Sequence, residues 1–117
     1  MKMMRDFLKV PKALGDKTRV RVLKMLQHKT MCVCEVRAVL GLAQSTTSKH
    51  LQILEDAGLI KKTKDGLWVN YDIDENSHNP FAGPIIKDLK NIFNDDPEVK
   101  ADLEKAKQAN RLELCPR

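Results

Sequence analysis

The sequence predicts a mainly α-helical chain that carries one β-hairpin, arranged as a winged helix-turn-helix, and three observations support this fold class. Two short helical patterns meet at a turn that contains Gly41, which is typical of a helix-turn-helix. The next stretch alternates between apolar and polar residues after Asp65-Gly66, a strong short-range signal for a hairpin. Further helical patterns flank both motifs. Because the chain has 117 residues, we expect a single domain over residues 1–117.

The first predicted helix covers residues 4–14, within the stretch MMRDFLKVPKALG. Its apolar residues recur at helical spacing and are Phe7, Val10 and Leu14. Gly15 follows in the position of a C-cap. Pro11 removes a backbone donor, so it should either kink this helix or begin a new one.

A second helix should begin after Asp16, which occupies the N-cap position in LGDKTRVRVLKMLQ. Its apolar stripe consists of Val20, Leu23 and Leu26. A third helix is expected to end at Leu40, before the turn at Gly41. A fourth should run from residue 43 or 44 to residue 57 and stop at Gly58.

The hairpin is predicted in LIKKTKDGLWVNYDI, where apolar or aromatic residues alternate at Val69, Tyr71 and Ile73. We expect a type I′ turn centred on Asp65-Gly66, because that turn needs positive φ at both central residues. Trp68 should pack under the hairpin, since proteins that read duplex DNA seldom need a stacking platform.

Two more helices are expected towards the C-terminus. The first should span about residues 81–93 and be interrupted early by Pro84. The second should begin at DDPE, residues 95–98, where a carboxylate can cap the helix and a proline can occupy its first turn.

The net charge of +5 arises largely from basic residues within the first 30 positions. This pattern favours a polyanionic partner, although a solvated lysine face explains it as well. No apolar run approaches the roughly 20 residues that a membrane span needs, and the N-terminus has no apolar signal core. We therefore expect a cytoplasmic protein with no membrane partner. In that reducing compartment three cysteines are a poor basis for a disulfide framework.

A helical wheel of the fourth helix, at about 100° per residue, separates two faces. The polar arc contains Ser45, Ser48, Lys49, Gln52 and Asp56, and the opposite arc contains Thr47, Leu51 and Leu54. The N-terminal part of such a second helix is the part that enters the major groove. An ordinary solvated helix face is the alternative interpretation.

The predicted DNA contacts come from this helix and from the hairpin. On the helix the candidates are Gln44, Ser45, Thr46, Thr47, Ser48, Lys49, His50 and Gln52. Amide side chains suit adenine, lysine suits guanine or phosphate, and hydroxyls suit either. His50 lies nearer the apolar arc, so packing or a phosphate contact competes with a base contact there. The hairpin lysines near the tip, Lys61, Lys62 and Lys64, suit phosphates beside a minor groove, and Lys62 and Lys64 are the candidates chosen among them.

Four segments, in order and at the right spacing, resemble a known family: LGDKTRVRVLKML, CVCEV, STTSKHLQILEDAGLI and KDGLWVNYDI. They are similar to the ArsR/SmtB family of metal-sensing repressors, and within it to the arsenite-responsive ArsR branch, over roughly residues 5–75. The resemblance implies a homodimer, paired through its first and penultimate helices, that leaves an inverted-repeat operator when a metalloid binds. It places the DNA-reading core at about residues 16–75 and the helices for dimerisation at residues 4–14 and 80–114.

Cys32 and Cys34 raise a question of geometry. In a regular helix their Cβ atoms would lie about 7 Å apart on nearly opposite sides, whereas two thiolates on one ion lie within about 4 Å of each other. An ion that takes both sulfurs should therefore distort the start of the third helix, which predicts a switch. The competing interpretation is that both are small side chains packed beneath Val36 and Val39.

Two or three sulfurs suit As(III) or Sb(III) better than a four-ligand zinc site. In the arsenite sensors that the chain resembles, a third cysteine often follows the pair, but Arg37 occupies that place here. Cys115 is the candidate for the third ligand, from the same or the partner chain, and the alternative is that it takes no part in the site. A cadmium or lead sensor of this family would carry extra cysteines ahead of the first helix, and this sequence has none there.

Together these features predict a metalloid-responsive transcriptional repressor that requires no cofactor, binds operator DNA as a homodimer and dissociates when As(III) or Sb(III) binds Cys32 and Cys34. A thiol redox-sensing repressor or a Cd- or Pb-sensing repressor of the same fold is the alternative. A winged-helix module that binds no DNA is a third hypothesis. An enzyme is not expected, because no nucleophile stands with a base and oxyanion donors.

Overall fold

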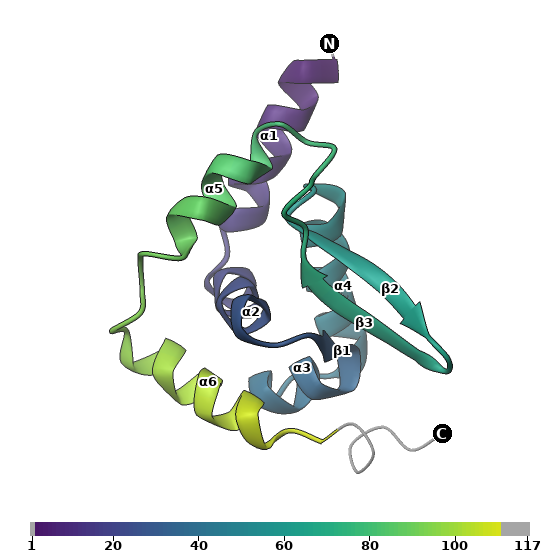
Figure 1. Cartoon of the computed structure of the whole chain (residues 1–117), viewed down its shortest axis with the longest axis vertical. Helices are drawn as coiled ribbons and strands as arrows, with labels where there is room; N and C mark the ends of the chain where they lie inside the picture. The colour runs from purple at the N-terminus through teal and green to yellow at the C-terminus, as the bar shows by residue number, and fades with distance from the viewer. Residues whose placement is uncertain (1, 111–117) are drawn as a thin grey trace.

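The computed structural model describes residues 2–110, which form six helices and a three-stranded antiparallel sheet (Figure 1). In chain order the elements are α1 (Lys2–Leu14), α2 (Lys17–His28), β1 (Met31–Cys32), α3 (Val33–Leu40), α4 (Gln44–Asp56), β2 (Ile60–Asp65), β3 (Trp68–Ile73), α5 (Ala82–Leu89) and α6 (Pro97–Gln108). The hairpin of β2 and β3 projects from the helices as a wing (Figure 1). The predicted winged helix-turn-helix is confirmed. None of the described helices is long and apolar enough to cross a membrane.

α1 is one helix, and it begins two residues earlier than predicted. Pro11 lies inside it, so the expectation that a new helix might begin there is wrong. Pro11 is exposed, and water can therefore reach the carbonyl that the missing backbone N–H leaves unpaired. On the inner side Val10 and Ala13 are buried, and Leu14 packs against the main core.

α2 runs through the centre of the core. Asp16 caps it as predicted, because its carboxylate accepts a hydrogen bond from the Thr18 backbone N–H at 2.7 Å. Residues 22–26 are all buried. They include Lys24, whose ammonium donates to the Leu89 carbonyl at 2.6 Å and so covers the end of α5. Burial lowers the pKa of Lys24. Buried side chains from the other five described helices join those of α2 in a single apolar cluster.

β1 was not predicted from the sequence. It has two residues and pairs with β3, so that Met31 lies opposite Tyr71 and Cys32 opposite Asn70. The sheet therefore has the order β1-β3-β2. This pairing connects the start of the helix-turn-helix directly to the second strand of the wing.

The hairpin turn differs from the prediction by one residue. Asp65 pairs with Trp68, so the two central residues of the turn are Gly66 and Leu67. Gly66 has a φ of 63°, and Leu67 is not among the described residues with positive φ. This is the pattern of a type II′ turn and not of type I′. Leucine is tolerated because only the first central residue adopts the conformation that favours glycine.

The two C-terminal helices are shorter than the predicted region. α5 ends at Leu89, four residues before the expected boundary. α6 begins as predicted, because Asp96 accepts hydrogen bonds from the backbone N–H groups of Glu98 and Val99 at 2.9 and 3.1 Å. Residues 111–114 of the predicted helical region lie outside the described residues.

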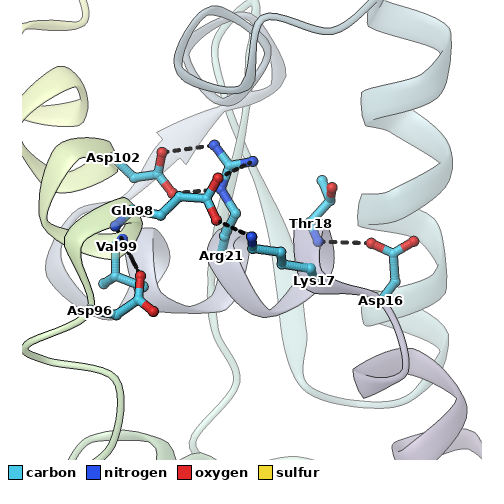
Figure 2. A network of polar contacts seen from close by, with 8 residues as sticks. All are labelled: Asp16, Lys17, Thr18, Arg21, Asp96, Glu98, Val99 and Asp102. Atoms are coloured by element: carbon cyan, nitrogen blue, oxygen red, sulfur yellow. Dashed lines mark hydrogen bonds and ion pairs between the residues drawn. The ribbon is translucent and has the colours of Figure 1, made fainter.

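Ion pairs hold α6 against α2 (Figure 2). The Nε and Nη2 atoms of Arg21 donate to the two carboxylate oxygens of the buried Asp102 at 2.8 and 2.9 Å. The Nζ atom of Lys17 lies 2.8 Å from Glu98, and this hydrogen bond lowers the pKa of the Glu98 carboxyl. α6 also contacts α3, so the C-terminal helix buttresses both α2 and the helix-turn-helix.

Candidate nucleic-acid interface and thiol site

α4 presents a polar face, as the helical wheel predicts. Gly41 ends α3 with a φ of 70° and donates its backbone N–H to the Arg37 carbonyl, which turns the chain into α4. The exposed side chains are Gln44, Ser45, Thr46, Ser48, Lys49 and Gln52. Leu51 and Leu54 are fully buried on the other side. The helix therefore has an open row of hydrogen-bonding groups at its N-terminal end.

Thr47 does not belong to that row. It is fully buried, and its hydroxyl donates to the Ala43 carbonyl at 2.9 Å. The prediction that Thr47 contacts DNA is therefore wrong, although the wheel had placed this residue on the apolar arc. Its hydroxyl instead closes the first turn of α4 from the inside.

His50 is half-buried between α4 and the N-terminal helices. Its Nδ1 atom lies 3.3 Å from the Nη1 atom of Arg19 on α2. This contact fits the packing role that the sequence allowed for His50, and it occupies one of the two ring nitrogens.

The wing carries lysines on both of its faces. Lys62 and Lys64 are two residues apart on β2, so their side chains lie on the same face, and both are exposed. The Nζ atom of Lys62 is 3.8 Å from a Glu55 carboxylate oxygen near the end of α4. Lys61 lies on the opposite face. Trp68 is buried beneath the wing, as predicted.

The two cysteines flank the start of α3. Cys32 is its N-cap, with extended backbone (φ −88°, ψ 169°), and Cys34 is in the first turn. Because Cys32 lies outside the helix, the separation worked out for two cysteines in a regular helix does not apply to this pair. Both are buried, and they form a separate cluster with Trp68, next to the half-buried Val33. Val36 and Val39 belong to the main core instead.

The Cys32 sulfur takes part in capping α3. It faces the backbone N–H of Glu35, while the Glu35 carboxylate accepts a hydrogen bond from the Cys32 N–H at 3.0 Å. Burial raises the pKa of the Cys32 thiol. Because the thiolate is the form that binds a metal ion, one ion can take both sulfurs only when both cysteines are reduced.

Sequence reasoning missed Glu35 as a residue of this site. It is buried, and its second oxygen lies 3.5 Å from the Lys29 ammonium. Lys29 also donates to the carbonyls of Ala106 and Ala109 at 2.9 and 3.1 Å, at the end of α6. The available signal was the spacing of a capping box, in which a glutamate stands three residues after the N-cap, here with cysteine in place of serine or threonine.

Within residues 2–110 no group of three or more His, Cys, Asp or Glu side chains could hold a metal ion. Cys115, the candidate for the third ligand, lies outside the described residues. The described part of the site therefore consists of two sulfurs, a tryptophan that covers them and the capping glutamate.

Comparisons with known proteins agree with this description. Residues 16–62 match the family model "Bacterial regulatory protein, arsR family". An arsenical resistance operon repressor of Bacillus subtilis is 36% identical over 83 residues, which is 70% of this chain and 76% of that protein. A homologue of the cadmium resistance regulatory protein CadC from Staphylococcus aureus is 38% identical over 71 residues, 60% of this chain and 59% of that relative's length.

Among solved structures, the homodimeric winged helix-turn-helix DNA-binding domain of a possible ArsR-family regulator from Mycobacterium bovis superimposes with a TM-score of 0.62 at 25% identity. The match covers 75% of this chain and 74% of that one. The fold, the exposed face of α4 and these relatives lead to one conclusion. This chain belongs to the arsR family of bacterial regulatory proteins, and it is a DNA-binding transcriptional repressor and not an enzyme.

Proposed function

We propose that this repressor binds an inverted-repeat operator as a homodimer and releases it when As(III) or Sb(III) binds Cys32 and Cys34. The observation that carries the proposal is the placement of both cysteine side chains in one buried cluster at the start of α3. α3 packs directly against α4, so a change at the thiols can reach the helix that reads DNA.

The operator is bound by two elements with different tasks. The N-terminal end of α4 enters the major groove, where its exposed side chains read base edges. These side chains are Gln44, Ser45, Thr46, Ser48 and Lys49. Gln52 extends this row. Lys62 and Lys64 bind phosphates on one flank, which strengthens binding without specifying sequence. Both sets are exposed and lie on elements that contact each other.

The switch acts through the cap of α3. An ion that binds the Cys32 sulfur competes with the backbone N–H of Glu35 for it, so α3 loses part of its cap. Cys32 also pairs with Asn70 on β3, so a shift of Cys32 pulls on the wing as well as on α3. The ion then favours a conformation in which wing and recognition helix no longer fit one operator together.

The choice of As(III) or Sb(III) rests on the donor set. Two buried sulfurs, with Cys115 as a proposed third, suit a three-coordinate thiophilic ion. The named function of the Bacillus subtilis relative, arsenical resistance, supports the same choice. Because the Staphylococcus aureus relative is named for cadmium resistance, Cd(II) is the ion to compare with As(III) and Sb(III).

The homodimer is proposed to form through α1. This helix exposes large apolar side chains, namely Met3, Met4, Phe7 and Leu8. Met3, Met4, Phe7 and Phe81 line a cavity of about 550 Å³ that is open to solvent. A second copy would bury these side chains and would place two recognition helices on one DNA duplex, as an inverted repeat requires.

The test is a gel shift on an inverted repeat, with protein kept reduced by a phosphine because dithiol reductants themselves bind arsenite. Arsenite should release wild-type protein, whereas Cys32→Ser and Cys34→Ser should bind DNA normally and ignore arsenite. The coupling should amount to about 1–3 kcal/mol or more, and DNA should weaken arsenite binding by the same factor. Cys115→Ser should weaken the response if Cys115 is the third ligand.

Two comparisons separate the alternatives. Release by peroxide and not by arsenite would favour a redox sensor, and release at lower Cd(II) than arsenite would favour a cadmium sensor. If the double variant Cys32→Ser, Cys34→Ser still released DNA at the wild-type arsenite concentration, the cysteine pair would be packing and the proposal would fail.

A further inference from the structure

Two polar side chains that belong to neither helix tie α1 to α4. The first is Arg19 on α2. Its Nε atom donates to the Ala13 carbonyl at 2.7 Å and its Nη2 atom to the Lys12 carbonyl at 3.2 Å, so it caps the C-terminus of α1. Its Nη1 atom lies 3.3 Å from the Nδ1 atom of His50, in the middle of α4. One guanidinium thus contacts the end of one helix and the side of the other.

The second tie is Asn79, in the loop between β3 and α5. It is almost fully buried. Its amide nitrogen donates to the Asp6 carbonyl on α1 and to the Ala57 carbonyl at the end of α4, both at 2.9 Å. Its side-chain oxygen accepts from the Phe81 backbone N–H at 3.0 Å. All of its hydrogen-bonding groups are therefore used, and a buried amide in this state is a rigid connector.

The two ties are spaced along both helices. On α4 they lie at His50 and Ala57, and on α1 at Asp6 and Ala13, which is about 10 Å apart on each helix at 1.5 Å per residue. Two contacts separated in this way fix both the distance between α1 and α4 and the angle at which the two helices cross. Apolar packing adds little, since Val10 and Ala13 are the only buried apolar residues of α1 among its described side chains.

We infer that Arg19 and Asn79 are positioning residues that set which half-site separation the operator must have. This inference rests on the proposed homodimer, in which α1 carries the interface and α4 reads the DNA. Because the interface fixes α1, the angle between α1 and α4 fixes the distance between the two recognition helices. α4 is about 20 Å long, so a tilt of about 10° moves its reading end by about 3.4 Å, which is one base-pair step.

The experiment uses the full chain and duplex DNA. Wild-type protein first selects its inverted repeat from a pool of duplexes with 30 randomised base pairs, a length chosen to exceed two half-sites one helical turn apart by roughly ten base pairs. From the selected sequence, duplexes are made whose half-sites are moved together or apart by one or two base pairs. Affinity is then measured by fluorescence anisotropy for wild type, Arg19→Gln, Asn79→Ser and the control Arg21→Gln. The control removes a guanidinium from the same helix, at the contact between α2 and α6, and leaves the contacts of α1 with α4 in place.

Wild type and Arg21→Gln should lose about tenfold or more in affinity for each base pair of altered spacing, as for a misplaced base contact. Arg19→Gln and Asn79→Ser should lose less than about threefold, because a free crossing angle lets α4 follow the DNA. Their affinity for a single half-site should equal that of wild type. If Arg19 and Asn79 only stabilised the fold, the two variants would bind every duplex more weakly, and each added or removed base pair would still cost them about tenfold.

The outcomes separate this inference from the function on which it rests. A wild-type chain that sediments as a monomer would overturn the homodimer and this inference with it. If wild type is a dimer and Arg19→Gln depends on half-site spacing as steeply as wild type does, the positioning role is wrong and the homodimer stands. Should Asn79→Ser fail to fold, Arg19→Gln carries the test, since Arg19 is not one of the residues of the apolar core.

Discussion

Gly41 and Gly58, at the ends of the two helices of the helix-turn-helix, have similar backbones and different surroundings. Their φ values are 70° and 78°. A Cβ atom added to Gly41 would meet nothing within 4 Å, whereas one added to Gly58 would overlap the Ser77 hydroxyl and lie 2.9 Å from the Asn79 Cβ atom. Gly41 is required by the backbone alone, and Gly58 by the backbone and by the loop packed against it.

The pair therefore offers a matched comparison of stability. Gly41→Ala should cost about 1–2 kcal/mol, the strain of a left-handed alanine. Gly58→Ala should cost about 3 kcal/mol or more, because displacement of the loop adds to that strain. Urea unfolding followed by circular dichroism measures both free energies. Equal losses would contradict the tight packing of residues 77–79 on the end of α4.

At the scale of elements, the wing separates electrostatic binding from sequence reading. Lys62 and Lys64 share one face of β2, and Lys61 lies on the other, where it pairs across the strands with Asp72. A single strand therefore supplies both the lysines proposed to contact phosphate and a lysine that should not.

Replacing Lys62 and Lys64 by alanine should weaken binding to all duplexes about equally. The dependence of log K on log salt should become shallower by roughly one for each lost phosphate contact. Lys61→Ala should leave this slope unchanged, and Ser48→Ala should cost about 1–3 kcal/mol at particular base pairs only. The measurement is a set of anisotropy titrations over a range of salt concentrations. A shallower salt dependence in Lys61→Ala would show that Lys61 contacts phosphate and would contradict this assignment.

Elements with strong local signals could be predicted from the sequence, and elements that depend on distant partners could not. Asp16 and Asp96 mark the starts of their helices because each carboxylate binds its own following N–H groups. β1 has two residues and exists through its pairing with β3, some 40 positions later in the chain. No local pattern encodes such a strand.

The same distinction holds for the candidate site. The polar arc of α4 was predicted because helical periodicity fixes which side chains share a face. The position of Cys32 was not, because the strand pairing that holds it outside α3 is distant in sequence. Arg19 and Asn79 carried no signal either, since their partners are backbone carbonyls of other elements.

At the scale of the whole molecule, α1 exposes large apolar side chains to solvent, and no other part of the described chain covers them. Phe7 is 48% exposed although its ring packs edge-on against Phe81. Leu14, on the same predicted apolar stripe, packs against the core instead. The surface available for a second copy is therefore the N-terminal half of α1, and substitution of Leu14 would test stability and not assembly.

Phe7→Glu should convert the homodimer into a monomer, because two buried carboxylates would face each other across the interface. Operator affinity should fall with dimerisation while the helical content stays the same. Leu67→Glu, which places the same charge on an exposed apolar residue at the wing tip, should remain dimeric. Sedimentation velocity on wild type, Phe7→Glu and Leu67→Glu measures the oligomeric state. If Phe7→Glu is still a dimer, the N-terminal half of α1 is not the dimer interface.

The pairing of Arg21 with Asp102 also has a consequence for synthesis. The two residues are 81 positions apart, and a ribosome that adds roughly 5–20 residues per second needs about 4–16 s to make that length of chain. By the last part of this interval the nascent chain contains α2, the recognition helix α4 and the wing, but it still lacks α6, the helix that packs against α2 and α3. The contact that closes α6 over α2 can therefore form only after residue 102 has been made, when nearly the whole described chain already exists.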